Sequence, residues 1–349
     1  MKDDKSERKF NLVWMSQGLG EADWIRHLLR PLICREIVAE RYEFIEPGSL
    51  YVVGASGAKS LQQIIPPSFL AALRNVKCKG LVHAGDEYYA GGYEVYRQFD
   101  FVLRQYHTAL FNHVPEVLTF PLGWAEGTPQ RSVLKPVEAR KYLWSFLGNQ
   151  TASSRPEMLK ALRRIEPQFV YCTAGPAGFN KISRSEYHAL LDDTVFAPCP
   201  MGNAVMETWR FYEALEAGCI PIIEARPWMR YHERLLGPHP VPVVYGWPRA
   251  ARLINDLSKD QARLRTLQQS IVSWWEQCKK RNETRIVQFI NEESGKQASQ
   301  LPIRHLPSTS PWWPMRQTIE LLRHQSAMSM VRRLSRPLGR LVSKVRSKH

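Results

Sequence analysis

The sequence contains no long apolar run and no closely spaced cysteine pair. Its six cysteines form no CxxC motif, and Cys172, Cys199 and Cys219 lie in or beside apolar segments. This pattern favours buried, reduced thiols over a disulfide framework or a zinc site. No run of about 18 apolar residues occurs, and the N-terminus, MKDDKSERKF, has no apolar core of the kind that signal peptides carry. We therefore expect a cytoplasmic chain without a transmembrane helix.

Several motifs that would assign a chemistry at once are also missing. The sequence has no GxGxxG fingerprint, Walker loop, HExxH or GxSxG motif, and no DxD pair of carboxylates. The simplest expectation is a reaction that requires no cofactor and no metal, although dependence on a divalent metal stays open.

The formal net charge of +15 indicates an anionic partner. The charge is uneven, because residues 316–349 hold nine Lys/Arg and one Glu, a net of 9 − 1 = +8. Apolar residues recur at intervals of three or four in this tail, at Val331, Leu334, Leu338, Leu341 and Val345. Such a basic amphipathic pattern suits an anionic membrane surface and predicts peripheral attachment to the inner face of a membrane. The alternative is a solvated terminus without fixed structure.

Short β-rich runs alternate with amphipathic helical segments along most of the chain. Strands are expected at 10–15, 49–56, 79–87, 100–106, 116–124, 141–148, 168–173, 194–200, 219–224 and 240–247. Helices are expected at 21–29, 66–75, 154–165 and 183–193, and 248–293 is mostly helical. This alternation predicts parallel sheets in an α/β fold, and the polar, proline-containing stretch 125–140 divides it. We expect an N-terminal domain (1–135) and a second domain (136–300) that face each other across a cleft, followed by a return segment and tail (301–349).

The most informative segment runs from Phe196 to Glu224. A strand leads through a loop with Gly202 and Asn203 into a helix expected to carry Glu207, Arg210 and Glu213 at a spacing of three, on one face. Arginine matches phosphate oxygens, and backbone N–H groups at a helix start bind phosphate. Glu213 is suited to accept hydrogen bonds from vicinal hydroxyls such as those of a ribose. The alternative is a solvated Glu–Arg–Glu ladder.

The same segment resembles a known donor-site signature. Cys199-Pro200-x-Gly202, Arg210-x-Tyr212-Glu213-Ala214 and Gly218-Cys219-Ile220-Pro221 are similar to the signature of exostosin-like glycosyltransferases (glycosyltransferase family 47), closest to their ribitol-xylosyltransferase-like branch. Residues 83–87, 101–106, 120–123 and 146–155 look like that family's acceptor half. The resemblance covers roughly residues 80–225. It implies a GT-B fold of two Rossmann-like domains, inverting transfer from a UDP-sugar, Glu213 at the ribose and Arg210 near the diphosphate.

Inverting transfer needs a base on the acceptor hydroxyl. Asp86 and Glu87 end a strand in the N-terminal domain, and we expect Asp86, or else Glu87, to be that base. The alternative for both is a loop carboxylate that caps the next segment.

Further donor contacts are expected where other strands end, because ligands of open α/β sheets bind at the carboxyl ends of the strands. Gly148 follows one strand, and Arg155 begins the next helix as a second phosphate contact. Arg104 is expected to reach the diphosphate from the opposite domain.

These observations predict a glycosyltransferase (hexosyl or pentosyl) that moves a sugar from a UDP-sugar to a glycan or lipid-linked acceptor in surface polysaccharide synthesis. The alternatives are a basic nucleic-acid-binding protein and an inactive GT-B-like scaffold. Nucleic acid is the weaker choice, since the charge is concentrated in the tail and no binding motif is present.

Overall fold

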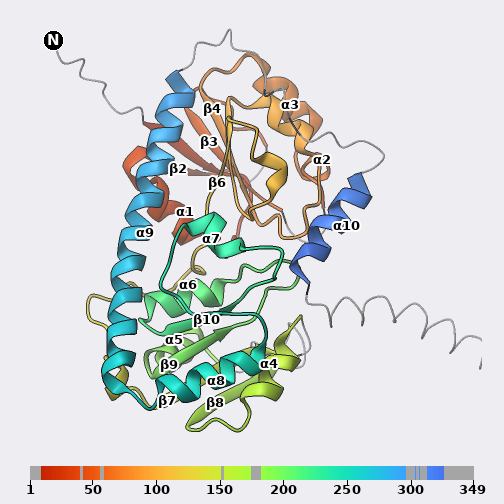
Figure 1. Cartoon of the computed structure of the whole chain (residues 1–349). Coiled ribbons are helices and arrows are strands. Elements are labelled where there is room, and N and C mark those ends of the chain that lie inside the picture. The colour runs from red at the N-terminus through yellow and green to blue at the C-terminus, as the bar shows by residue number, and fades with distance from the viewer. Residues whose placement is uncertain are drawn as a thin grey trace, which may run out of the picture.

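The computed structural model describes residues 9–39, 42–55, 59–150, 153–173, 182–295, 303, 306 and 313–325. Two parallel sheets lie one above the other, each with helices packed around it (Figure 1). The strands are β1 (Phe10–Trp14), β2 (Ile33–Val38), β3 (Ser49–Gly54), β4 (Lys79–Ala84), β5 (Phe101–Arg104), β6 (Val117–Thr119), β7 (Tyr142–Asn149), β8 (Gln168–Thr173), β9 (Thr194–Cys199), β10 (Ile220–Glu224) and β11 (Val243–Val244).

The helices surround and connect these strands. They are α1 (Ala22–Leu29), α2 (Leu61–Ile64), α3 (Pro67–Ala72), α4 (Arg155–Leu162), α5 (Arg184–Asp192), α6 (Trp209–Glu216), α7 (Tyr231–Leu236), α8 (Trp247–Leu257), α9 (Gln261–Gly295) and α10 (Trp313–His324). Short 3-10 helices lie at Arg30–Leu32, Leu73–Asn75, Tyr93–Gln98, Ala109–Phe111 and Val137–Ala139.

The first sheet has the order β2-β1-β3-β4-β5-β6 and all its strands are parallel. The central strands β3 and β4 are almost wholly buried, as expected for a sheet covered on both faces. The sequence gives no sign of β2, because this edge strand includes Arg35 and Glu36, which are exposed. Charged residues are typical of such an edge.

The second sheet, β11-β10-β9-β7-β8, is also wholly parallel and repeats the strand order of the first. In both sheets the chain changes direction after the second strand, between β1 and β3 and again between β7 and β9. Loops at the carboxyl ends of the strands diverge at such a switch point and leave room for a ligand. The predicted two-sheet α/β architecture is therefore confirmed.

Helices α9 and α10 connect the two halves on opposite sides of the molecule (Figure 1). Helix α9 packs on α1 and β5 of the first half and on α6, α8 and β10 of the second. The predicted linker 125–140 lies within the connection between β6 and β7 and is anchored at both ends. The N–H of Gly127 donates to Oδ2 of Asp23 in the first half, and Arg140 donates to the carbonyls of Leu191, Thr194 and Ala217 in the second.

The structure bears on three further expectations in different ways. Helix α6 begins at Trp209 after the N-cap residue Thr208, so the prediction that this helix carries Glu207 is wrong. All six cysteines are free thiols, and Cys199, Cys219 and Cys278 are buried. The amphipathic tail at 331–349 lies outside the described residues. None of the described helices combines the length and apolar character needed to cross a membrane.

Candidate active site

A cavity of 660 Å³ opens between the two halves of the molecule. The first half lines it with residues that follow β4, β5 and β6: Glu87, Tyr106, Leu122, Ala125 and Glu126. The second half lines it with Leu147, Gly148, Asn149, Arg155, Ile182, Ser183, Arg184, Tyr187, His188, Gly202, Asn203, Glu207, Thr208, Trp209, Arg210 and Glu213. Pockets for small molecules have this size and commonly lie between domains.

In the second half, the cavity lies at the switch point of the second sheet, between β7 and β9. Gly148 lies near the end of β7, and Gly202 and Asn203 lie in the loop after β9. A Cβ atom at Gly202 would lie 2.7 Å from the carbonyl oxygen of Glu207 and 2.9 Å from Oε1 of Glu87. Gly148 has φ of +152°, and a Cβ atom there would lie 3.0 Å from Nη2 of Arg210. Gly202 therefore requires glycine because a Cβ atom would clash with backbone, and Gly148 because other residues rarely adopt its φ angle.

Two arginines enter the cavity from the starts of two helices. Arg210, in the first turn of α6, donates a hydrogen bond to the carbonyl of Leu147, and its guanidinium lies 4.2 Å from the ring centroid of Phe146. Arg155 is the first residue of α4, and its Nη1 donates to the carbonyl of Asn149 at 3.2 Å. Its buried Nε has no hydrogen-bond partner. Burial, together with the charge of Arg210, lowers the pKa of Arg155 to about 10. An anion between these groups would stabilise both charges.

Glu213 lies one turn beyond Arg210 on α6. Its Oε2 accepts a hydrogen bond from the hydroxyl of Tyr187 at 2.8 Å. The side chain is buried, and burial raises its pKa, while the hydrogen bond from Tyr187 and the charge of Arg210 act in the opposite direction. The predicted pair Arg210 and Glu213 is therefore brought together in one cavity with Arg155.

Glu87 reaches the cavity from the other half. Its Oε1 accepts a hydrogen bond from the backbone N–H of Ala204 at 2.9 Å, which connects the loop after β4 to the loop after β9. Glu126 is the second carboxylate of the first half at the cavity, and its side chain has no hydrogen-bond partner among the described residues. The first half thus contributes two carboxylates to the cavity that Arg155 and Arg210 also line.

Glu207 also borders the cavity, but its carboxylate is already occupied. Oε1 accepts from the backbone N–H of Leu122 at 2.7 Å and from the hydroxyl of Tyr212, and Oε2 accepts from the hydroxyl of Tyr231 at 2.7 Å. Burial raises the pKa of Glu207. The prediction of Glu207 as a donor ligand is corrected: its hydrogen bonds hold the two halves together.

The structure also corrects the expected roles of Asp86 and Arg104, neither of which lines the cavity. Asp86 is 1% exposed and accepts hydrogen bonds from the Tyr93 hydroxyl at 2.6 Å and the Ala90 N–H at 2.8 Å. Nη2 of Arg104, which is fully buried, lies 3.0 Å from Oδ2 of Asp86. The two residues form a buried ion pair inside the first half and are not among the residues that line the cavity.

Three cavity residues had no assigned role in the sequence. Tyr187 lies on α5, Trp209 opens α6 with 40% of its surface exposed, and Tyr106 has φ of +60°. A left-handed backbone is rare for an aromatic residue and is found at ligand sites. Tyr106 could have been recognised from the sequence, because it lies just after the strand β5, where ligands of such sheets bind. No feature of the sequence indicates that Tyr187 lines the cavity. Among the described residues, no group of three or more His, Cys, Asp or Glu side chains is placed to hold a metal.

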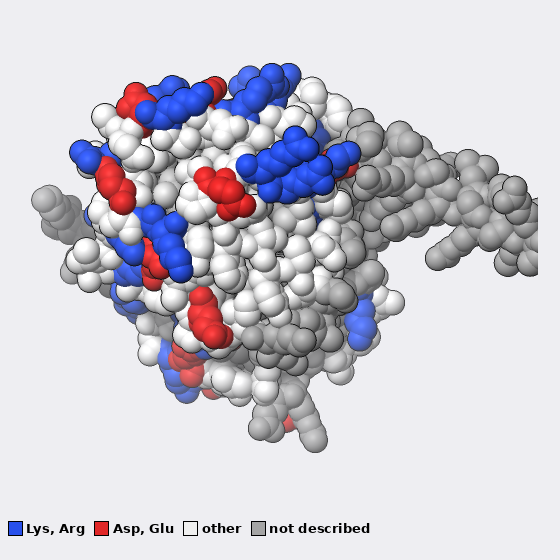
Figure 2. Space-filling model, turned by 90° about the horizontal axis from the view of Figure 1, so that it is seen from below, with Lys and Arg blue, Asp and Glu red and all other residues white. Residues whose placement is uncertain are grey.

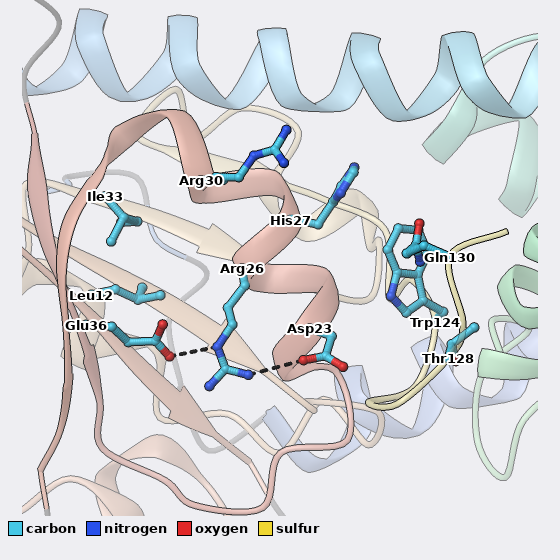
Figure 3. Close-up of a pocket in the computed structure, with 10 residues that line it drawn as sticks. All are labelled: Leu12, Asp23, Arg26, His27, Arg30, Ile33, Glu36, Trp124, Thr128 and Gln130. Carbon is cyan, nitrogen blue, oxygen red and sulfur yellow. Dashed lines mark hydrogen bonds and ion pairs between the residues drawn. The ribbon is translucent and has the colours of Figure 1, made fainter. Parts of the chain in front are cut away.

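A second cavity of 410 Å³ lies beside α1 in the first half (Figure 3). Arg26 spans it between Asp23 and Glu36, at 3.2 Å and 2.7 Å. Trp124 and Thr128 border it from the same loop that carries Glu126 to the larger cavity. Both of its carboxylates pair with Arg26, whereas Arg155 and Arg210 of the larger cavity form no ion pair with a carboxylate of the described residues. The larger cavity is therefore the candidate active site.

Comparison with known proteins agrees with this geometry. Residues 127–294 match the family model of the RXYLT1 C-terminal domain. A search of curated proteins finds no significant match. An α-glucosyltransferase solved with UDP and a 13-mer DNA superposes with a TM-score of 0.54 at 13% identity, covering 80% of this chain and 99% of that one. An α1,3-fucosyltransferase superposes with a TM-score of 0.52 at 13% identity, covering 84% and 92%.

The structural likenesses establish the fold, which is GT-B, as the resemblance implied. The family match covers the second half of the molecule, with Arg155, Arg210 and Glu213 in it. Residues 127–294 are therefore similar to the RXYLT1 C-terminal domain, in line with the resemblance to exostosin-like glycosyltransferases carried by the sequence motifs.

Proposed function

We propose that the chain transfers a sugar from a UDP-sugar, with inversion, to a hydroxyl of a glycan or lipid-linked acceptor in surface polysaccharide synthesis. The observation that carries the donor assignment is the trio Arg155, Arg210 and Glu213 in one cavity at the switch point of the second sheet. The two guanidinium groups suit a diphosphate, and the carboxylate suits the ribose hydroxyls. The solved α-glucosyltransferase with the same fold was bound to UDP.

The positions of the carboxylate of Glu87 and of the two arginines suggest how the sugar would be transferred. Glu87, on the acceptor side of the cavity, takes the proton from the acceptor hydroxyl. The hydroxyl oxygen then forms a bond to the anomeric carbon, and the bond from that carbon to the β-phosphate oxygen breaks, so that UDP leaves with the electron pair. Arg155, Arg210 and the N–H groups after Gly202 stabilise the charge that develops on the diphosphate. This step uses only groups of the chain, and we propose that it requires no metal.

The acceptor and the membrane belong to the same proposal. We place the enzyme on the inner face of a membrane, attached through the basic tail, where lipid-linked acceptors would be available. Nucleic acid is the weaker partner. On the face shown in Figure 2, the basic side chains lie in separate groups with acidic side chains among them. Nucleic-acid binding would favour a continuous basic stripe instead.

A thermal-shift panel of UDP-, GDP- and CMP-sugars tests the donor. We expect stabilisation by UDP and UDP-sugars and none by the GDP and CMP compounds. A shift with none of them would overturn the proposed function, and a shift with GDP-sugars alone would reassign the donor.

The base is tested separately with matched carboxamides. Glu87→Gln should remove transfer while UDP still raises the melting temperature, and Glu126→Gln should keep most of the activity. The reverse result would assign the base to Glu126. Both residues lie at the cavity and come from the first half, so the pair controls for general changes in the pocket.

A further inference from the structure

Helix α10 leaves part of its apolar surface exposed although it packs on the protein. The face turned toward the protein carries Gln317, Glu320 and His324 beside Leu321, which packs against the hydrophobic core. The opposite face carries Met315, which is 54% exposed, and Ile319, which is 49% exposed. Surface helices normally bury their apolar stripe and expose their polar one. The outward apolar stripe therefore calls for a partner.

The polar face accounts for how α10 is held. Nε2 of Gln317 donates to the carbonyl of Tyr88 at 2.9 Å, and the Thr108 hydroxyl donates to Oε2 of Glu320 at 3.3 Å. Nδ1 of His324 accepts from the N–H of Met206 at 3.1 Å. These contacts reach both halves of the molecule. The helix is thus fixed by these hydrogen bonds together with the packing of Leu321, and Met315 and Ile319 remain exposed to solvent.

Two further exposed side chains lie on or next to α10. Trp228, in the loop between β10 and α7, is 47% exposed, and its Nε1 donates to the carbonyl of Arg323 at 2.9 Å. Arg316 is exposed beside Met315 and has no ion-pair partner among the described residues. We call Met315, Arg316, Ile319 and Trp228 the α10 surface. It combines aliphatic, aromatic and cationic side chains, the composition of segments that lie in the headgroup region of a bilayer.

We propose that the α10 surface docks on an anionic lipid bilayer. The sequence beyond α10 supports this partner over a protein, because residues 326–349 continue directly from it with seven Lys/Arg and no Asp or Glu. A basic segment and an exposed apolar stripe joined in one chain suit the same anionic surface. The proposal extends the attachment suggested for the tail to a surface of the folded protein. It does not rest on catalysis.

Docking here would also orient the cleft. His324 bonds Met206, the neighbour of Glu207 in the cavity wall, so α10 lies next to the candidate active site. A bilayer on the α10 surface would bring the cleft close to membrane-borne acceptors. This consequence, unlike the docking itself, rests on the proposed function.

Vesicle binding by the full chain tests the surface. Vesicles of phosphatidylglycerol and phosphatidylcholine in equal amounts are compared with phosphatidylcholine alone in co-sedimentation. The double variant Met315→Gln/Ile319→Gln keeps good helix formers at both positions. Its partition into the anionic vesicles should fall about tenfold, as expected when two half-exposed apolar side chains lose their contact with lipid. Val133→Gln, at a position 84% exposed in a loop, is the control and should bind as the parent does.

Tryptophan fluorescence distinguishes membrane binding through the α10 surface from binding through the tail alone. Brominated phosphatidylglycerol should quench part of the tryptophan emission in the parent, and Trp228→Phe should remove that part, whereas Trp209→Phe should not. Vesicle binding without quenching at Trp228 would overturn the surface and leave the tail as the anchor. Equal binding of the double variant and the parent would also overturn it, as would dimers of the parent that the double variant abolishes. Unchanged UDP binding by the double variant would keep this test independent of donor binding.

Discussion

Arg155 and Arg210 enter the same cavity from the starts of two helices, and neither forms an ion pair with a carboxylate among the described residues. Each donates to a backbone carbonyl near the end of β7, and the charge of Arg210 contributes to the lowered pKa of Arg155. Like charges held this close with no direct ion pair to a carboxylate indicate a site prepared for an anion. The proposed binding of the donor diphosphate can therefore be tested by replacing Arg155 alone.

Arg155→Met should weaken UDP binding about tenfold to a hundredfold, the range for loss of a charged hydrogen bond. The unliganded variant should be no less stable than the parent, because burial and Arg210 both disfavour the charge of Arg155. Calorimetric titration with UDP and urea unfolding measure the two effects. Arg163→Met, at an exposed position just after the same helix, is the matched control. Unchanged UDP affinity in Arg155→Met would remove this residue from the donor site.

Glu213→Gln should weaken UDP binding about tenfold while raising stability at neutral pH. Burial raises the pKa of Glu213 in the folded chain, so the folded state binds this proton more tightly than the unfolded state. Its contribution to stability is complete below the unfolded pKa and is lost as the pH rises through the folded value. The neutral amide removes that loss and can still accept the hydrogen bond from Tyr187.

The measurement for Glu213 is urea unfolding across this pH range, with UDP titration at neutral pH. Tyr187→Phe serves as a comparison, since it removes the hydrogen bond and keeps the carboxylate. Equal UDP affinity in the parent and Glu213→Gln would argue against a ribose contact by this side chain.

Asp86→Asn should destabilise the fold by about 3–5 kcal/mol, because it leaves the charge of the fully buried Arg104 uncompensated. Any loss of activity in this variant should therefore follow its loss of stability. The double variant Asp86→Leu/Arg104→Leu should recover part of the loss, since no unpaired charge remains. A parent-like free energy of unfolding in Asp86→Asn, with transfer abolished, would instead return the role of base to Asp86.

The sequence predicted the parts of the fold that depend on periodicity. Alternating apolar strands and helices indicated two parallel sheets, and the ends of β7 and β9 were correctly placed at one site. The strand β2 escaped detection because an edge strand need not be apolar. Arg210 and Glu213 line one cavity from the same helix, and their three-residue spacing was visible in the sequence because it is local information.

Burial of polar side chains could not be predicted in the same way. Asp86 and Glu87 are neighbours at one strand end, yet one is enclosed by Arg104 and Tyr93 and the other lines the cavity. Glu207 likewise reads as a site residue, and only its contacts with Leu122 and Tyr231 show that it joins the two halves. These outcomes depend on contacts between residues far apart in the chain.

Glu21→Gln should stabilise the protein at alkaline pH and have little effect in acid. Glu21 precedes α1, is 4% exposed, and burial raises its pKa from 4.5 to about 7, against the effect of a hydrogen bond to its own backbone. The protonated form therefore contributes stability that is complete below 4.5 and is lost as the pH rises toward 7. At about pH 8 the amide should gain on the order of 3 kcal/mol over the ionised parent, and at about pH 5 the gain should nearly vanish. Urea unfolding at the two pH values, with the exposed Glu43→Gln as control, measures it; an equal gain at both would show that this carboxyl does not titrate between them.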